Sequence, residues 1–351
     1  MTDATAVVET SPEADPDGKN PRKRGKGRRI ALIVVLVVVL LAGVGVVGIG
    51  LYLRSVESGI ERVDAFESVP EEARPQKEVA AKDAMNILML GSDSRDPDSS
   101  SGSRTDTIIL AHIPKDRSSA QLISIPRDTW VKVPKSKDGR HGGVESKINS
   151  AYSWGGVSLM VQTVESYTNV RVDHVAMVDF AGFKEIVDAL GGVTVDVDVA
   201  FTSTHYLDKQ RKFVKGPMKM DGATALDYAR ERYAFADGDF ARIRHQQQVI
   251  KAILDKAASG GTLTNPAKLN SFVRATTDTV SVDKELNILD MAGELRHLRS
   301  DTLGFYTSPT KGTGMIGDQS VVLPDPAKAK TLYDAVRRDA VDEILAAAQP
   351  T

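Results

Sequence analysis

A stretch of 24 residues without a charged side chain, Ile30 to Leu53, constrains the fold of this chain more than any other feature. As an α-helix it would be about 36 Å long, enough to cross a hydrocarbon layer of about 30 Å with some tilt. Helices buried in the core of a soluble domain rarely reach this length without one charge. The stretch therefore predicts a transmembrane helix over residues 30–53.

The flanking residues predict an uncleaved anchor and its orientation. A secretory signal peptide has an apolar region of only about 7–15 residues, followed by small residues at the cleavage site. Here the apolar stretch is longer, and RSVESGIERVD follows it. Seven Lys and Arg residues lie between positions 19 and 29, which predicts a cytoplasmic N-terminus. We therefore expect a single-pass protein of the cell membrane, whose chain from about Arg54 onward lies outside the cytoplasm.

The remainder of the chain has the composition of a globular protein, with 41% hydrophobic and 26% charged residues. The absence of cysteine excludes disulfides and thiolate metal sites, but it does not decide the compartment. We expect a disordered basic tail over residues 1–29 and, after the anchor, an extracytoplasmic stalk over residues 54–84. A single folded domain is expected over residues 85–345, in which we find no internal repeat.

Alternating elements within that domain predict its fold class. Near-continuous apolar runs at 86–90, 106–113 and 120–125 are typical of strands covered on both faces. Helical patterns lie at 157–168, 181–190, 222–229, 239–258, 284–299 and 326–346. Such alternation predicts an α/β protein, namely a three-layer α/β/α sandwich around a central mixed β-sheet.

Polar residues gather at the ends of the three apolar strands. Asp93 follows the first strand, Arg104 and Asp106 open the second, and Arg127 and Asp128 follow the third. If the sheet brings these ends together, they form a site, because open α/β sheets bind ligands at such edges; taken singly, each is also compatible with an ordinary turn. Carboxylates without cysteine favour a hard cation such as Mg²⁺ or Mn²⁺, and arginines favour phosphate.

A second polar group lies in YARERYAFADGDFARIRHQQQ, residues 228–248. Arg230 and Arg232 would point about 200° apart on a helix, so they can share a face only if the preceding helix ends near Ala229. The next helix places Asp239, Arg242 and Gln246 on one face. Arg244 lies on another face, and we expect it to be solvated or structural.

The same helical face continues into the apolar residues Val249 and Ile253. A polar head with an apolar continuation suits an amphiphilic ligand with a phosphate group. The alternative is that both residues belong to the hydrophobic core. The sequence alone leaves this choice open.

Several blocks of residues 86–250 together resemble the LytR-CpsA-Psr family of bacterial cell-envelope enzymes. The blocks are NILMLGSDSR, RTDTIILAHI, LISIPRDTWV, KINSAYSWGG, DHVAMVDFAGFKEIVDALGGV, DGATALDYARER and DGDFARIRHQQ. The resemblance implies a magnesium-dependent phosphotransferase that moves a glycopolymer from a polyprenyl-pyrophosphate carrier to a peptidoglycan sugar hydroxyl. The product would be a phosphodiester.

The resemblance also assigns roles to individual residues. Catalytic roles fall on Asp93, Asp106, Arg127, Arg230 and Arg232. Pyrophosphate contacts fall on Arg104, Arg127, Lys147, Arg230, Arg232, Arg242 and Gln246. Asp93 and Asp106 would bind magnesium, Asp239 would hold the arginines, Val249 and Ile253 would contact the lipid tail, and Asp93 is our choice of general base. The chain departs from the family at Arg244-His245, where Gln-Arg is expected.

Three other functions fit parts of the sequence. A pyrophosphatase would use the same site with water as the nucleophile. A wall-binding module without catalysis could stack Trp130, Tyr152 or Trp154 on sugars, although such aromatic residues more often pack in a core. A nucleic-acid-binding regulator is disfavoured, since the arginines would lie across the membrane from DNA and no helix-turn-helix is evident. The sequence does not name the glycopolymer.

Overall fold

The computed structural model describes residues 57–92, 105–204, 208–295 and 298–342. Residues Arg54–Thr351 form one compact unit, and the description below concerns that unit alone. The predicted transmembrane helix and basic tail lie outside the described residues. Within the described ranges, no helix combines the length and the apolar character needed to span a membrane.

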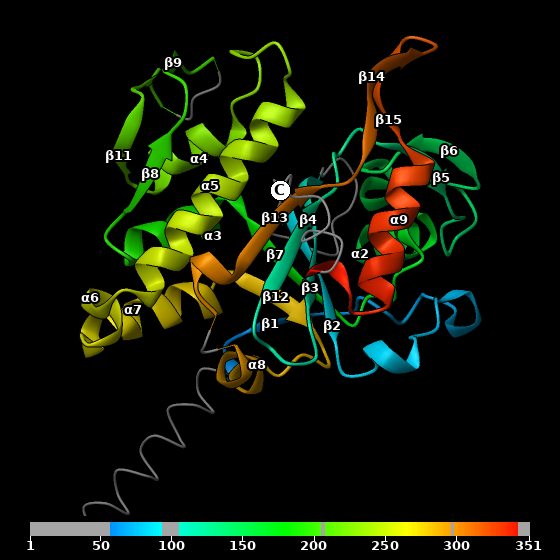
Figure 1. Ribbon diagram of the computed structural model, residues 1–351, viewed down its shortest axis with the longest axis horizontal. Coiled ribbons are helices and arrows are strands. Elements are labelled where there is room, and N and C mark those ends of the chain that lie inside the picture. Colours follow the sequence, from blue (N-terminus) through cyan, green and yellow to red (C-terminus); the bar gives the residue numbers. More distant parts are fainter. Residues whose placement is uncertain (1–56, 93–104, 205–207, 296–297, 343–351) are drawn as a thin grey trace, which may run out of the picture. The chain divides into compact units, whose positions relative to one another are not determined.

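A mixed sheet of seven strands lies at the centre of the unit (Figure 1). Its order is β1 (Glu61–Val63), β12 (Val280–Asp283), β7 (His174–Asp179), β2 (Met85–Ser92), β3 (Thr105–Ile113), β4 (Ala120–Ser124) and β13 (Leu303–Thr307). Strand β2 is parallel to β7 and antiparallel to β3, and β4 is parallel to β13. The three apolar runs of the sequence are β2, β3 and β4. The predicted α/β class with a central mixed sheet is confirmed.

Alternate residues of these strands pack into separate clusters on the two faces of the sheet. On one face Leu88, Leu110 and Ile123 pack with residues of α2 (Ser150–Thr168) and α9 (Pro326–Arg337). On the other face Ile87, Ile109 and Leu122 pack with residues of α5 (Asp239–Ala258) and α8 (Ile288–Glu294). Figure 1 shows α2 and α9 on one side of the sheet and α5 on the other.

A second core lies beside the sheet. Its helices are α3 (Phe180–Ala189), α4 (Gly222–Arg230) and α5. Two antiparallel pairs of strands belong to it, β8 (Val193–Val197) with β11 (Gly216–Met220), and β9 (Phe201–Thr202) with β10 (Lys212–Phe213). The remaining elements are β5 (Trp130–Val133), β6 (Val144–Lys147), α6 (Gly260–Leu263), α7 (Pro266–Thr277), β14 (Thr310–Ile316), β15 (Gln319–Pro324), and the short 3-10 helices η1 (Glu71–Ala73), η2 (Val79–Ala81) and η3 (Ser300–Thr302). Helix α5 contributes to both cores.

The structure differs from the sequence prediction in several places. Residues 61–63, which we expected in a stalk, form the edge strand β1, because Ile60 and Val63 are buried. Helix α2 begins at Ser150, before the predicted residue 157. A non-helical Gly155-Gly156 pair separates its first segment from the segment that the sequence predicted. The expected helices at 284–299 and 326–346 are shorter, as α8 and α9 end at Glu294 and Arg337.

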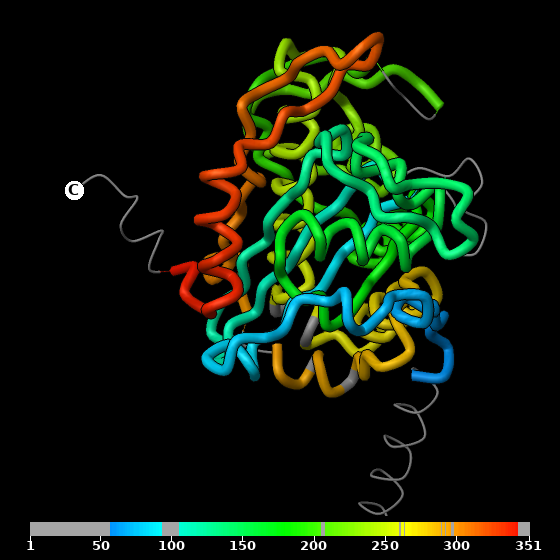
Figure 2. The backbone as a smooth tube through the Cα atoms, turned by 90° about the vertical axis from the view of Figure 1, so that its right-hand side faces the viewer, coloured from blue at the N-terminus to red at the C-terminus, as the bar shows by residue number. Residues whose placement is uncertain are grey.

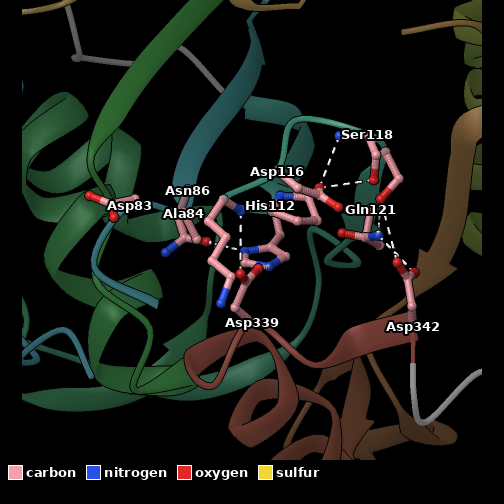
Figure 3. Close-up of polar contacts among 12 residues, drawn as sticks. Asp83, Ala84, Asn86, His112, Asp116, Ser118, Gln121, Asp339 and Asp342 are labelled. Atoms are coloured by element: carbon pink, nitrogen blue, oxygen red, sulfur yellow. Dashed lines mark hydrogen bonds and ion pairs between the residues drawn. The ribbon is translucent and has the colours of Figure 1, made fainter. Parts of the chain in front are cut away.

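The chain after α9 is tied back to the sheet through the buried His112 of β3 (Figure 3). The His112 ring nitrogens lie 2.8 Å from Asn86 Oδ1 and 3.0 Å from Asp339 Oδ1. Asp339 has a left-handed backbone with a φ of 56°. Figure 2 shows the end of α9, in red, beside the neighbouring strands. This tether holds the last described turn against the core.

We expect Asp339→Gly to lower the free energy of unfolding by about 2 kcal/mol, because a buried imidazole nitrogen loses its partner. Glycine keeps the left-handed backbone, so the loss reports the carboxylate and not strain. The matched control is Asp342→Gly, since the exposed Asp342 accepts a bond of 2.9 Å from Gln121 Nε2 nearby. Urea unfolding that gave equal losses for both variants would contradict the tether.

Candidate functional site

The sheet order brings the polar strand ends to one edge. Strand β3 lies between β2 and β4, and Ser92 at the end of β2 pairs with Thr105 at the start of β3. Asp106 is therefore at this edge, and Arg127 follows three residues after the end of β4 on the same side. The expectation that these ends meet is confirmed for Asp106, Arg127 and Asp128; Asp93 and Arg104 lie outside the described residues.

A row of alternating charges runs along this edge. Arg127 Nη1 forms an ion pair with Asp106, and its Nε lies 3.7 Å from Asp128 Oδ2. Lys147 Nζ lies 3.5 Å from Asp128 Oδ1. Lys147 lies in this row because it pairs with Trp130 in the β5–β6 ladder, and Trp130 follows Asp128 closely in the chain. The predicted Lys147 thus joins the strand-end residues.

Arg230 and Arg232 lie at the end of helix α4 and directly after it. Arg230 is the last helical residue, and the next residue is extended with φ −66° and ψ 133°. The helix therefore ends one residue later than predicted. The Arg230 guanidinium lies 4.5 Å from the Phe180 ring centroid, and that of Arg232 lies 4.4 Å from Tyr233. Stacking on aromatic rings orients a guanidinium while leaving its in-plane donors open to an anion.

Asp239 connects Arg232 to the next helix, as the sequence predicted. Its Oδ1 lies 3.3 Å from Arg232 Nη1, and its Oδ2 lies 3.2 Å from Arg242 Nη2. Asp239 opens α5, and a carboxylate at this position also favours the positive end of the helix dipole. One acidic side chain thus holds two arginines of different elements.

Helix α5 is fixed to the same sheet edge. Gln247 Nε2 donates to Ser124 Oγ at the end of β4 and to the Tyr306 carbonyl of β13, each at 3.2 Å. Gln247 thereby sets the helix beside the point where Arg127 emerges. Arg242 and Gln246 lie about one turn apart on α5, toward its beginning.

Arg242 lies within electrostatic reach of charged residues from both polar groups. Burial lowers the pKa of the Arg242 guanidinium, as does repulsion from Arg127 and Arg232, while attraction from Asp239 and Asp106 opposes this. Arg242 is only 4% exposed. The three guanidinium groups of Arg127, Arg232 and Arg242 lie within electrostatic reach of one another and share two carboxylates, Asp106 and Asp239. Positive potential therefore remains that an anion would offset.

The apolar residues of α5 divide between two cores. Val249 is fully buried in the second core, and Ile253 packs against that same core. Ile250, which the sequence analysis did not single out, faces the sheet with the partly buried Met89 and Phe305. The predicted lipid contacts of Val249 and Ile253 remain a prediction.

Arg244 stays outside the site. Its Nη1 lies 2.5 Å from Asp237 Oδ2, and both side chains are more than 40% exposed, at 45% and 44%. The expectation that Arg244 differs from the other three arginines is confirmed.

Of the two predicted metal ligands, Asp93 and Asp106, only Asp106 lies in the described residues. Asp106 is 20% exposed and uses Oδ1 for Arg127. Magnesium needs only one or two protein carboxylates when water and phosphate oxygens complete its shell. No cluster of three or more acidic, His or Cys side chains suited to a metal occurs in the described part of the chain. Asp106 could therefore hold such a cation with few protein ligands.

The sequence analysis missed one residue near the site, Phe180, and assigned no role to another, Asp128. Phe180 follows β7, the parallel neighbour of β2, so its position at a strand end was the available signal. Asp128 was noted at a strand end but given no role, and it bridges Arg127 and Lys147. Phe180 contacts Arg230, and Asp128 contacts Arg127 and Lys147. The sequence analysis had identified all three of these cationic residues.

The fold and the candidate site thus define an α/β protein with a cluster of arginines at one edge of its central sheet. The family described as LytR_cpsA_psr matches residues 52–337. The chain belongs to the LytR-CpsA-Psr family.

Named relatives carry more specific descriptions. The chain is 32% identical over 277 residues to polyisoprenyl-teichoic acid–peptidoglycan teichoic acid transferase TagU of Enterococcus faecalis, a match that covers 78% of this chain and 84% of the relative. TagU of Bacillus subtilis is 33% identical over 252 residues, covering 71% and 76%. The crystal structure of B. subtilis TagV superimposes with a TM-score of 0.63 at 28% identity, covering 74% of this chain and 98% of TagV.

Proposed function

We propose that this protein transfers a cell-wall glycopolymer from a polyprenyl-pyrophosphate carrier to a peptidoglycan sugar hydroxyl, forming a phosphodiester. The observation that carries the proposal is the convergence of Arg127, Arg232 and Arg242 beside Asp106 at one sheet edge. The names of the TagU relatives, which describe transfer of teichoic acid from a polyisoprenyl carrier to peptidoglycan, support the proposal at that coarser level. We also propose that residues 30–53 anchor the protein, with the site outside the cytoplasm.

In this reaction the acceptor hydroxyl oxygen attacks the phosphorus next to the glycopolymer. The bond from that phosphorus to the bridging oxygen breaks, and polyprenyl phosphate leaves. The pyrophosphate linkage supplies the driving force, which suits a compartment without ATP. Charge on the phosphate oxygens increases in the transition state, and preorganised guanidinium groups stabilise it there more than in the ground state.

Each arginine has a distinct position for this task. Arg232 and Arg242 share Asp239, so their guanidinium groups are held before the donor binds. Arg127, which follows β4, is held by Asp106 on the neighbouring strand β3, and Lys147 extends the positive charge beyond Asp128. The hydroxyl proton passes to a carboxylate, for which we propose Asp93. A Mg²⁺ ion held by Asp93 and Asp106 would neutralise phosphate charge.

The test uses the full chain in detergent micelles with a lipid-linked glycopolymer, with and without peptidoglycan oligomers. We expect a phosphodiester-linked product that appears only with the acceptor, and Asp106→Asn to lower its rate at least about 100-fold. The variant Asp318→Asn, in the exposed β14–β15 turn, should leave the rate unchanged. Release of free glycosyl phosphate at the same rate with or without acceptor would identify a pyrophosphatase instead.

A further inference from the structure

Glu231 lies between Arg230 and Arg232 and is completely buried, with 0% exposure. A negative charge directly after the end of helix α4 also faces the negative end of the helix dipole. Burial and dipole both disfavour a carboxylate at this position, so its presence requires compensating contacts.

Five donors converge on this carboxylate. Three are successive backbone N–H groups of the turn that follows, from Arg232 at 2.9 Å, Tyr233 at 2.9 Å and Ala234 at 3.2 Å, all donating to Oε1. The other two come from Thr204, whose hydroxyl donates to Oε1 at 2.7 Å and whose backbone N–H donates to Oε2.

Successive backbone N–H groups form a concave site for an anion. Here the Glu231 side chain fills that site itself, so the turn carrying Arg232 is closed onto its own preceding residue. The two contacts from Thr204 tie this closed turn to the segment after β9. The backbone of Glu231 thus becomes a fixed link between two arginine side chains.

The outer ends of both arginines are fixed separately. Arg230 stacks on Phe180 after β7, and Arg232 is held by Asp239 at the start of α5. The distance between the two guanidinium groups therefore depends on the backbone between them, which Glu231 holds. We propose that Glu231 is a positioning residue that sets the spacing of Arg230 and Arg232 for a pyrophosphate group. The inference rests on the proposed function.

The primary variant is Glu231→Gln, which keeps the shape but replaces one of the two acceptor oxygens with an NH2 group that only donates. The donors that converge on Oε1 and the Thr204 N–H on Oε2 can then no longer all be satisfied. We expect faster hydrogen exchange at the amides of residues 232–234 and at least about tenfold weaker binding of inorganic pyrophosphate, measured by calorimetry on the full chain in micelles. In the transfer reaction, kcat should fall about 10- to 100-fold, while KM for the peptidoglycan acceptor stays unchanged.

The matched control is Glu165→Gln. Glu165 is also buried, at 2% exposure, and accepts a backbone N–H from Val172 at 2.9 Å together with Arg74. It lies on α2, and its loss should lower stability without weakening pyrophosphate binding. Thr204→Val, which removes only the hydroxyl contact, should retain the fold and weaken binding by about threefold if the Gln variant does not fold.

The outcomes separate the two proposals. Wild-type protein that fails to bind pyrophosphate would overturn the proposed function, and the inference with it. Binding by the wild type together with unchanged binding by Glu231→Gln and Thr204→Val would overturn the inference alone. Equal weakening by Glu165→Gln would also overturn it, since the effect would then follow stability and not the arginine spacing.

Discussion

Replacing Arg127 with lysine is expected to lower the rate of glycopolymer transfer by about 100- to 1,000-fold and to leave the fold unchanged. Arg127 contacts Asp106 through Nη1 while its Nε lies 3.7 Å from Asp128, so one planar group spans two carboxylates. Lysine keeps the charge but offers no fixed pair of donors to a phosphate. The loss should appear mainly in kcat, because the developing phosphate charge depends most on this geometry.

A matched control is Arg140→Lys. Arg140 Nε lies 3.6 Å from Asp138, so the pair resembles that of Arg127, yet the Arg140 side chain is 81% exposed. We expect neither the transfer rate nor the melting temperature to change, because exposed ion pairs contribute little. A transfer rate for Arg127→Lys within about threefold of the wild type would exclude the proposed role of this guanidinium.

The fold was predictable where local pattern and burial agree. The runs that became β2, β3 and β4 are apolar on both faces because helices cover both faces of the sheet. Strand β1 was not predictable, since three residues, Glu61–Val63, carry too little pattern and pair only with the distant β12. The start of α2 was missed for a local reason, because Gly155-Gly156 interrupts its helical geometry.

The sequence predicted which residues belong to the candidate site better than it predicted which residues contact one another. Arginines at a helix end and carboxylates at strand ends were visible in the sequence, and the sheet order places Asp106 and Arg127 together. The sequence could not show that Phe180 lies under Arg230, because the two are 50 residues apart and meet only in the fold. Helical spacing predicted only approximately which face of α5 carries Val249. In the structure this residue is buried in the second core.

His245, in a pair of residues where the family resemblance predicted Gln-Arg, has a physical consequence for stability. Its ring is completely buried and stacks on Phe201 with a centroid distance of 5.4 Å and an angle of 4°. Tyr228 and Phe235 close the cluster at 4.3 Å and 5.0 Å. Burial lowers the pKa of His245 to about 4, although the Asp198 carboxylate partly opposes this. The ring is therefore neutral in the folded protein at pH 7.

Because the pKa is lower in the folded state than its ordinary value of 6.5, the unfolded chain binds the proton first as the pH falls. The stability from a neutral His245 is fully present above pH 6.5 and is lost as the pH falls from there toward 4. Between pH 7.5 and pH 5 the loss should be about 2 kcal/mol. His245 lies on α5 between Arg242 and Gln246, so acid should loosen the helix that carries part of the site.

We expect His245→Phe to remove about 2 kcal/mol of this pH dependence, because phenylalanine keeps the aromatic stack and has no group to protonate. Urea unfolding of the full chain, followed by the fluorescence of Trp130 and Trp154, measures the free energy at both pH values. The comparison at pH 7.5 gives the packing change alone, and the difference between the two pH values isolates protonation. Parallel losses in wild type and variant between pH 7.5 and 5 would show that His245 does not carry this acid sensitivity.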